Sequence, residues 1–388
     1  MSVGASTKVK MLIWSVFQSC KTKRTDGQAW SIIQWSLQAI YKGKHPYSDH
    51  TGKRYDKNTA EGQLAGTDLA GGFFGVIWSI KADLDYYTKN LQLKHYSADS
   101  PCEYCGCDKK LPGPMKPMTF GPTCQWKHRC FTGRQWRDQQ ESLHPIFRSF
   151  VFLSCLNVEA DELHVLWLGV AQYLLGSVLW LLVFKKLVSM ADVWGSIVES
   201  GGCLYTNMMV RFFVDEKKPK TSWPKLKGRG AQVKSLVGPL LQTWARYMDK
   251  AVVFDVKVCE CLELLLEISD LVDLTAKQTF MPEQDCIKLL QCVEALLDLY
   301  TWLGLRSDEA GDCLFSAAPK LHWLWHMAHR SIYLHPRRVS CWLDEDYMKH
   351  VKRLASSATN GVARHLVPRQ VVEKYRQSMA FWESIRSS

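Results

Sequence analysis

The sequence predicts an α/β fold that is mostly helical overall, with a partial sheet at the front and a large all-α block behind it. Residues 8–17 are rich in β-branched and aromatic side chains, as strands are. Residues 71–80 form an apolar run of the length of a buried strand. Between them, residues 28–41 place apolar side chains at helical spacing. From residue 161 to the end of the 290s helical patterns dominate, so we expect half of a sheet interrupted by a helical insertion.

The helical block contains two amphipathic segments, residues 258–279 and 285–305, which predict an antiparallel pair of helices. A basic stretch at residues 214–234 interrupts the block. We expect four segments along the chain: a partial α/β region at 1–100, a cysteine-rich knuckle and loop at 101–160, a helical insertion at 161–310 and a helical C-terminal part at 311–388.

The composition is that of a globular protein, and the net charge favours an anionic partner. The chain has 388 residues, a formal net charge of +11 and fourteen cysteines. The positive charge favours a polyanion, either nucleic acid or an anionic membrane surface. Residues 1–14 lack the long apolar stretch of a signal peptide. We therefore expect an intracellular protein with reduced thiols, some of them free to bind metal.

Residues 165–184 are mostly apolar, and about 20 such residues can span a bilayer. Gln172 lies near the middle of this segment, and Asp161 and His164 lie just ahead of it. A helix that is apolar all round can equally be the centre of a large helical core. We expect the buried helix, with a membrane anchor as the alternative.

Asp83 follows the apolar run at residues 71–80. Folds of the α/β class place their chemistry at the C-terminal ends of such strands. Aspartate is also a favoured N-cap, and a short helix is predicted at residues 83–93. On position alone, the cap is the better interpretation.

Two further groups of residues carry carboxylates. Asp161 and His164 are three residues apart on one helix and could share a metal or a proton. An aspartate that complements the helix dipole is the simpler interpretation. Three acids lie at the start of a predicted basic helix in the C-terminal part of the chain: Asp344, Glu345 and Asp346. Acids gather at helix starts without any other function, which is the simpler interpretation.

Cys102 and Cys105 form a Cys-x-x-Cys zinc half-site in an irregular loop, and such a site needs two more ligands. His322 and His326 stand four residues apart, the spacing that lets two imidazoles on one helix bind one ion. Core packing explains these histidines equally well. Other candidate ligands are Cys107, Cys124, His128 and Cys130 in the same loop and His329 on the same helix face.

Two basic motifs could neutralise phosphates and give salt-sensitive DNA binding with little sequence preference. A solvated loop is the commoner role of such a run of charge. The residues are Lys225, Lys227, Arg229, Arg337 and Arg338.

Together these motifs resemble the DDE transposases of the cut-and-paste DNA transposons, nearest to the CACTA type. In that family, an RNase H-like fold is interrupted by a helical insertion before its last catalytic acid. Asp83 in "GVIWSIKADLDYY" resembles the second catalytic Asp, and "PCEYCGC" stands about where the family has a Cys-x-x-Cys pair. Asp161-Glu-Leu-His164 is similar to the Asp-x-x-His signature that opens the insertion. "LDEDYMKHVKRL" is similar to the CACTA Glu-Arg-Tyr-Met-Lys stretch, which selects Glu345 as the last acid.

The resemblance implies an RNase H-like core built from residues 1–100 and 311–388. It implies that Asp83 and Glu345 bind the catalytic Mg²⁺ or Mn²⁺. It also implies a nuclear or other intracellular protein that binds DNA and could form a homo-oligomer, with no small-molecule substrate and with a membrane partner disfavoured. As in the related catalytic subunit of the V(D)J recombinase, one structural zinc would be bound by Cys102, Cys105, His322 and His326.

The first catalytic Asp of the family has no counterpart in this sequence. In the RNase H fold that residue lies on the first strand of a three-stranded hairpin, whereas residues 8–17 correspond to the third strand. Two metal ions held by three carboxylates stabilise the reacting phosphodiester, and two carboxylates hold such a pair poorly. We therefore expect a truncated gene or transposon relic that is inactive or nearly so. The alternative is a non-catalytic remnant that binds DNA or protein.

Overall fold

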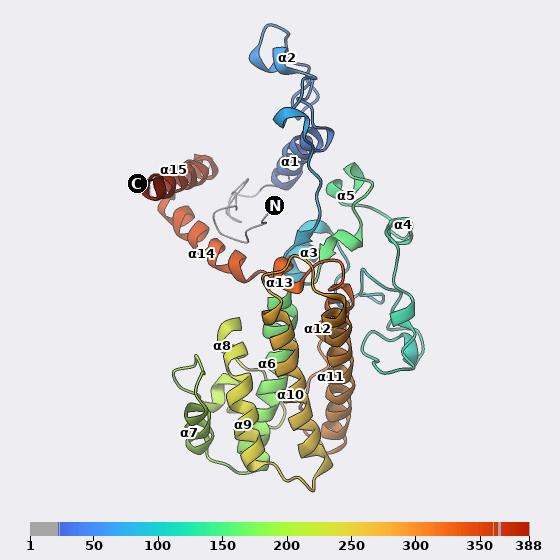
Figure 1. The fold of residues 1–388 in the computed structure, drawn as a ribbon, viewed down its shortest axis with the longest axis vertical. Helices are drawn as coiled ribbons and strands as arrows, with labels where there is room; N and C mark the ends of the chain where they lie inside the picture. The colour runs from blue at the N-terminus through green and yellow to red at the C-terminus, as the bar shows by residue number, and fades with distance from the viewer. Residues whose placement is uncertain (1–21, 23, 360, 364–365, 388) are drawn as a thin grey trace. The chain divides into compact units, whose positions relative to one another are not determined.

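The structure is a computed structural model that describes residues 22, 24–359, 361–363 and 366–387. It is mostly helical (Figure 1). The part that it describes has one small sheet of two parallel strands. The predicted dominance of helix is confirmed. The strand predicted at residues 8–17 lies outside the described residues.

The chain forms two compact units. The second and larger unit comprises residues 81–132 and 158–341, and it contains the metal-ligand candidates and most of the helices. The first unit comprises residues 1–80, 133–157 and 342–388.

The first unit contains the helix that the sequence predicts at residues 28–41, which is confirmed as α1 and ends at Gly43 in a left-handed conformation. Its short 3₁₀ turns are η3 (Ala70–Gly72) and η6 (Cys155–Asn157). Its helices are α1 (Thr25–Lys42), α2 (Ala60–Leu64), α4 (Gly133–Asp138), α5 (Pro145–Ser149), α14 (Trp342–Ser357) and α15 (Val367–Ser387).

The second unit is a helical bundle with an irregular cysteine-rich loop. Its sheet consists of β1 (Ile80–Lys81), which starts at the last residue of the first unit, and β2 (Val158–Glu159). Short helical turns occur at η4 (Gly113–Met115), η5 (Trp126–His128) and η9 (Val210–Phe212). The longer elements are α3 (Leu84–Leu91), η7 (Leu163–Val170), α6 (Ala171–Trp180), η8 (Leu181–Lys185), α7 (Met190–Ser200), α8 (Gly230–Ser235), α9 (Val237–Tyr247), α10 (Val253–Leu274), α11 (Glu283–Glu309), α12 (Lys320–Arg330) and α13 (Pro336–Val339).

The prediction of a buried strand at residues 71–80 is wrong. Only Ile80 belongs to a strand, and no strand in the described ranges pairs with residues 73–79. Phe73, Phe74 and Trp78 are 79%, 70% and 62% exposed. An apolar run becomes a buried strand only when neighbouring strands supply hydrogen bonds and cover. The small sheet does not establish an RNase H-like fold, which stays a prediction.

The apolar segment from Leu163 to Lys185 is continuous through η7, α6 and η8, and 89% of its most apolar window is buried. Among the described residues it is the one helix long and apolar enough to cross a membrane. Its surroundings are protein: the Gln172 carbonyl accepts a hydrogen bond from the Leu226 amide at 2.9 Å. The Ser177 hydroxyl accepts one from the Phe315 amide at 2.9 Å. The helix is therefore buried, as predicted.

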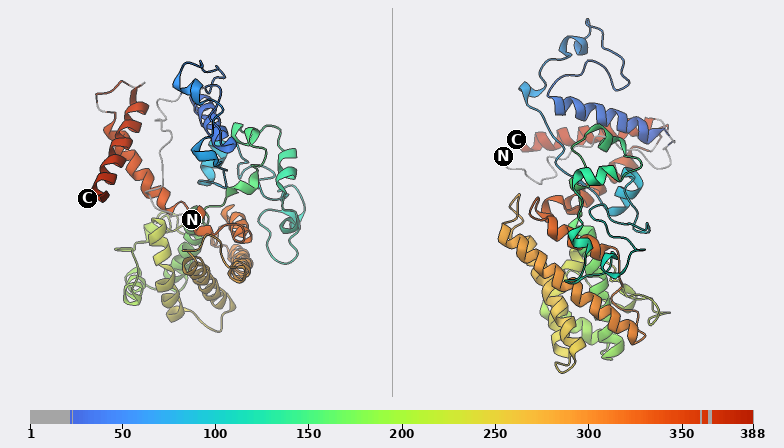
Figure 2. Two further views of the ribbon diagram at one scale, coloured as in Figure 1. Left: turned by 45° about the horizontal axis from the view of Figure 1, so that its top comes forward. Right: turned by 90° about the vertical axis from the view of Figure 1, so that its right-hand side faces the viewer.

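The predicted pair of amphipathic helices is confirmed as α10 and α11, which pack against each other (Figures 1 and 2). Leu262 and Leu265 of α10 and Val293 and Leu296 of α11 are completely buried. Burial of four such side chains contributes about 1.5–3 kcal/mol each before the loss of chain entropy. Helix α11 also packs against α12, and this contact fixes the helix that carries the candidate histidine ligands.

His335 forms a buried N-cap on α13 that is sensitive to protonation. Its Nδ1 accepts from the Arg337 amide at 3.0 Å, and its Nε2 lies 2.8 Å from the Thr275 hydroxyl oxygen. The Thr275 hydroxyl donates to the Leu271 carbonyl at 2.7 Å, so its oxygen accepts from His335. The imidazole is therefore neutral, with its proton on Nε2. Burial, helped by Arg338 and Arg337, lowers the pKa of His335 to about 4.

Acid should destabilise the second unit through His335. Unfolded histidine binds its proton near pH 6.5, whereas folded His335 binds it only near pH 4, so stability falls as the pH decreases across that window. We expect the wild type to lose about 3 kcal/mol more unfolding free energy between pH 7 and pH 4 than His335→Gln. Urea denaturation at pH 7, 5.5 and 4 measures this difference, and parallel profiles for the two proteins would contradict it.

Candidate metal centre and adjoining pocket

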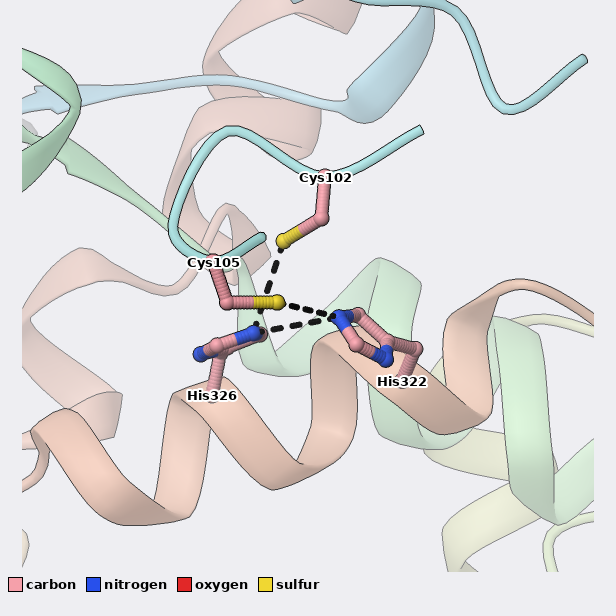
Figure 3. Close-up of side chains that lie close together, drawn as sticks. All are labelled: Cys102, Cys105, His322 and His326. Carbon is pink, nitrogen blue, oxygen red and sulfur yellow. Dashed lines mark hydrogen bonds between the residues drawn. The ribbon is translucent and has the colours of Figure 1, made fainter. Parts of the chain in front are cut away.

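Four side chains that the sequence marks as candidate zinc ligands come together in the second unit (Figure 3). Cys102 and Cys105 lie in the cysteine-rich loop, and His322 and His326 lie on successive turns of α12. Their ligand atoms all lie within 4.8 Å of one another. All four residues are at least 97% buried. The group could therefore bind a metal ion, as predicted.

The loop that carries the cysteines is fixed by backbone hydrogen bonds. The Tyr104 amide donates to Cys102 Sγ at 3.3 Å, and the Gly106 amide donates to the Arg129 carbonyl at 3.0 Å. Cys105 forms an isolated antiparallel bridge with Cys130. The chain therefore turns back on itself around Cys102 and Cys105 and directs both sulfur atoms toward α12 (Figure 3).

The distances between the donor atoms are close to the edges of a zinc tetrahedron. Cys102 Sγ lies 3.4 Å from His326 Nε2, and Cys105 Sγ lies 3.4 Å from His322 Nε2. The two Nε2 atoms are 3.1 Å apart. Bond lengths of about 2.3 Å for zinc–sulfur and about 2.05 Å for zinc–nitrogen give edges of about 3.6 Å and about 3.3 Å. The four donors therefore already surround a space of the correct size.

The tautomer of His322 also suits a metal ligand. Its Nδ1 lies 2.8 Å from the Pro117 carbonyl oxygen. A carbonyl can only accept, so Nδ1 carries a proton, and Nε2 is the ring nitrogen that faces the cysteines and could bind a metal. The Trp126 ring lies 4.1 Å from the His322 ring, and the Tyr104 ring lies 4.9 Å from the His326 ring. These aromatic rings exclude water from the group.

A third thiol, that of Cys107, lies beside the group, and its ionisation depends on that of Cys102 and Cys105. Cys107 Sγ is 3.7 Å from His322 Nε2. Burial opposes ionisation of Cys102, but hydrogen bonding with Cys105 and the two histidines lowers its pKa to about 6. Hydrogen bonds from Cys102 and Cys105 lower the pKa of Cys107 to about 2, whereas burial and the neighbouring thiols raise that of Cys105. Three sulfurs in one buried space cannot all ionise unless a cation joins them.

A pocket of about 350 Å³ adjoins the candidate metal centre within the second unit. Asp83, His164 and Lys225 all line it, although the sequence suggested three different roles for them. The cysteine-rich loop contributes Pro101 and Glu103, which flank the ligand Cys102. Helix α12 contributes Lys320 and Trp323, and Trp323 is the residue after the ligand His322. The metal centre therefore lies directly behind two walls of the pocket.

Asp83 is the N-cap of α3, the simpler of its two predicted roles. Its carboxylate accepts from the Tyr86 amide at 2.6 Å. The same residue also lines the pocket, so the cap does not remove it from the site. Glu345 lies in the first turn of α14 in the first unit, and its pairing with Asp83 stays a prediction.

Asp161 and His164 are in direct contact, and Cys341 joins them in a second group of close donors. The Asp161 carboxylate already accepts from the Leu163 amide at 3.0 Å and from the Cys341 amide at 2.7 Å. Because its oxygens already accept these hydrogen bonds, Asp161 is better explained as a structural residue than as a metal ligand. Sequence reasoning missed Cys341 because it is 180 residues from Asp161 and belongs to no spacing pattern.

The predicted DNA-binding arginines have protein partners. Arg337 binds the buried Glu162 at 3.0 Å and Asp273 at 3.0 Å. Arg338 donates to the carbonyls of Gln278 and Lys277. These contacts give both arginines a structural role. Lys225, Lys227 and Arg229 lie in a lysine-rich segment, residues 225–229, and are exposed, although Lys227 Nζ also donates to the Arg211 carbonyl at 2.8 Å.

Comparison with known proteins identifies no relative: no family model matches the chain, and neither does any curated protein or solved structure. Function must therefore be inferred from the metal centre, the pocket and the charges around them.

Proposed function

We propose that the chain is a transposase-derived, CACTA-like DNA-binding protein whose Cys102, Cys105, His322 and His326 bind one structural zinc ion. One observation carries the proposal: Cys105 and His322 are 217 residues apart in the sequence, yet their donor atoms are 3.4 Å apart. The resemblance to the DDE transposases implies this pairing of a Cys-x-x-Cys with a distant histidine pair. Two thiolates and two imidazoles are a typical zinc donor set, and four protein ligands leave no open position for catalysis.

The zinc ion would hold the pocket together. It would join the cysteine-rich loop to α12. Both elements line the pocket with residues close in sequence to their ligands: Pro101 and Glu103 in the loop, and Lys320 and Trp323 in α12. Tyr104 lies between the two cysteines in the sequence, and its ring packs edge-on against the Trp323 ring, with 5.1 Å between the ring centres. A metal that joins these elements would keep the pocket in one shape, as structural zinc does in small loops that lack a core of their own.

The lysine-rich segment supports DNA binding because its backbone is fixed. The amides of Lys225 and Lys227 donate to the carbonyls of Phe213 and Phe212, and the Leu226 amide donates to the Gln172 carbonyl. Leu226 is completely buried, whereas Lys225, Lys227 and Arg229 alternate with buried or small residues and are exposed. An ordered row of cations can neutralise several phosphates at once.

Strand cleavage and transfer with Mg²⁺ or Mn²⁺ would be the ancestral activity, with Asp83 and Glu345 as two of its three metal-binding acids. We infer that this chain alone binds DNA without cutting it, because two carboxylates hold a pair of divalent ions poorly. A second candidate is a purely non-catalytic DNA- or protein-binding remnant. The Asp83 cap favours it, since a carboxylate occupied by the Tyr86 amide has less capacity for metal.

Duplex binding at increasing salt tests the proposal. Replacing Lys225, Lys227 and Arg229 by glutamine should reduce the slope of log K against log salt by about 2.7, because each phosphate contact contributes about 0.9. A matched control replaces Lys217, Lys218 and Lys220 by glutamine. These exposed residues lie in the preceding turn, so the control removes the same amount of positive charge. Equal slopes for the two triple variants, or no duplex binding by the wild type, would refute the DNA-binding row.

Nicking assays with manganese separate the two candidates. The wild-type chain should not nick plasmid DNA, nor should Glu345→Gln or Asp83→Asn. Nicking by the wild type that Glu345→Gln abolishes would show that the chain is a complete nuclease. Nicking recovered when a strand bearing an aspartate is fused to the N-terminus, and lost again with Glu345→Gln, would favour the transposase-derived site over the non-catalytic remnant.

A further inference from the structure

Lys225 and Lys320 both line the pocket beside the metal centre, and the structure fixes the position of each. Lys320 Nζ donates to the Leu168 carbonyl at 2.8 Å, where η7 departs from helical geometry at Leu168 and Gly169. A Cβ on Gly169 would lie 2.6 Å from Lys320 Cδ, so a glycine is needed for the lysine to cross this break. Short π-helical turns next to α-helix, as η7 is to α6, occur frequently at functional sites.

Lys225 reaches the same pocket from the lysine-rich segment. A Cβ on Gly176 of α6 would lie 3.0 Å from the Lys225 amide nitrogen, so the segment packs directly on the helix backbone. Lys225 Nζ lies 5.2 Å from the centre of the Tyr173 ring. Lys225 and Lys320 therefore line the same pocket, and two cationic side chains in one pocket favour an anionic ligand.

Three carboxylates also line the pocket, and each has a partner in the chain; that of Glu103 is the Lys94 amide. Asp83 accepts from the Tyr86 amide, and Asp85 pairs with Lys89 at 2.8 Å. Within the described part of the chain, no ion pair within 4.0 Å is found for Lys225 or Lys320. The amines of Lys225 and Lys320 are therefore available to an anion in the pocket.

An aromatic platform stands at the rim of the pocket. Tyr96 is 60% exposed, and its ring centre lies 3.9 Å from that of His95, which also lines the pocket. Tyrosine and histidine faces stack on nucleobases with little dependence on sequence, at about 1–3 kcal/mol per base. The exposed Tyr96 ring can therefore supply a stacking surface for a flat ligand in the pocket.

We propose that the pocket binds one nucleotide, with its phosphate between the amines of Lys225 and Lys320 and its base against Tyr96. A volume of about 350 Å³ lies within the usual range of ligand sites. That the nucleotide belongs to an unpaired DNA strand rests on the proposed function. A free nucleotide offers the same chemistry, so the test must distinguish the two sources.

Isothermal titration of the full chain with thymidine 5′-monophosphate, thymidine and inorganic phosphate tests the pocket. The monophosphate should bind at least about 10-fold more tightly than either part alone, because it uses both the lysines and the ring. Lys320→Met and Tyr96→Ala should each weaken its binding about 10-fold, and the exposed Lys250→Met should not. Tyr96 is at the surface, so its variant keeps the fold even if Lys320→Met does not. Equal binding by wild type and Tyr96→Ala would overturn the assignment.

Competition between duplexes with blunt ends and duplexes with a single-stranded overhang identifies the source. A preference for the overhang that Tyr96→Ala abolishes, with blunt-duplex binding unchanged, would support a DNA strand in the pocket. Monophosphate binding without any duplex binding would overturn the proposed function and the DNA source, and it would leave a free-nucleotide site. Duplex binding without monophosphate binding would overturn the pocket alone.

Discussion

Replacing Cys105 by serine is expected to remove the bound zinc and to lower the melting temperature of the second unit by about 10 °C or more. Structural zinc sites bind with apparent free energies of about 10–16 kcal/mol in small domains, and that energy is lost on unfolding. In a unit of this size each 1 kcal/mol shifts the melting temperature by about 2–4 °C, so losing even a third of the metal's contribution suffices. Elemental analysis for one zinc per chain and scanning calorimetry measure the two effects.

Cys259→Ser is the matched control for this experiment. Cys259 is a partly exposed thiol on α10 that contacts Glu263 at 3.8 Å and belongs to no metal-ligand group in the described chain. A chelator should lower the melting temperature of the wild type and of Cys259→Ser to that of Cys105→Ser, and should leave Cys105→Ser unchanged. Cys107→Ser should keep the metal, because Cys107 lies beside the four ligands and not among them. Wild-type protein without metal after expression with added zinc would contradict the assignment.

The candidate metal ligands could be predicted because spacing carries chemical information. A Cys-x-x-Cys in a loop and two histidines one helical turn apart are each half of a site, and a family resemblance joins the halves. Asp83 was predictable in the same way, because an aspartate ahead of a helical pattern predicts an N-cap. In each case the relevant residues lie within five positions of one another.

The rest of the site could not be predicted because it depends on contacts between distant segments. Lys320 matters only because Gly169, 151 positions earlier, leaves room for it, and neither residue belongs to a motif. The exposure of Phe73 and Trp78 could not be predicted either, because here the contacts that the pattern suggests are absent from the described structure. Their apolar pattern matches that of a buried strand, but burial requires neighbouring strands that local sequence cannot specify.

Arg330→Met should destabilise the second unit by about 3–5 kcal/mol while leaving its zinc content unchanged. Arg330 lies one turn beyond the ligand His326 on α12, and its guanidinium binds Glu159 of β2 at 2.9 Å and 3.4 Å. Both side chains are about 90% buried. Burial raises the pKa of Glu159 despite this partner. Loss of the arginine would therefore leave a buried carboxylate with no countercharge, which costs more than the intact pair contributes.

The pH dependence and a double variant separate charge from packing. Arg330 also lies 5.1 Å from the centre of the Tyr104 ring, so its removal loses some contact as well as charge. If the unpaired carboxylate dominates, protonation will relieve it, and the difference in unfolding free energy between wild type and Arg330→Met should shrink from pH 7 to pH 5. Arg330→Met combined with Glu159→Gln should recover at least about half of the loss, since a neutral amide is cheaper to bury. A double variant no more stable than Arg330→Met would instead show that the aromatic contact between α12 and the cysteine-rich loop, not the ion pair, sets the stability of this region.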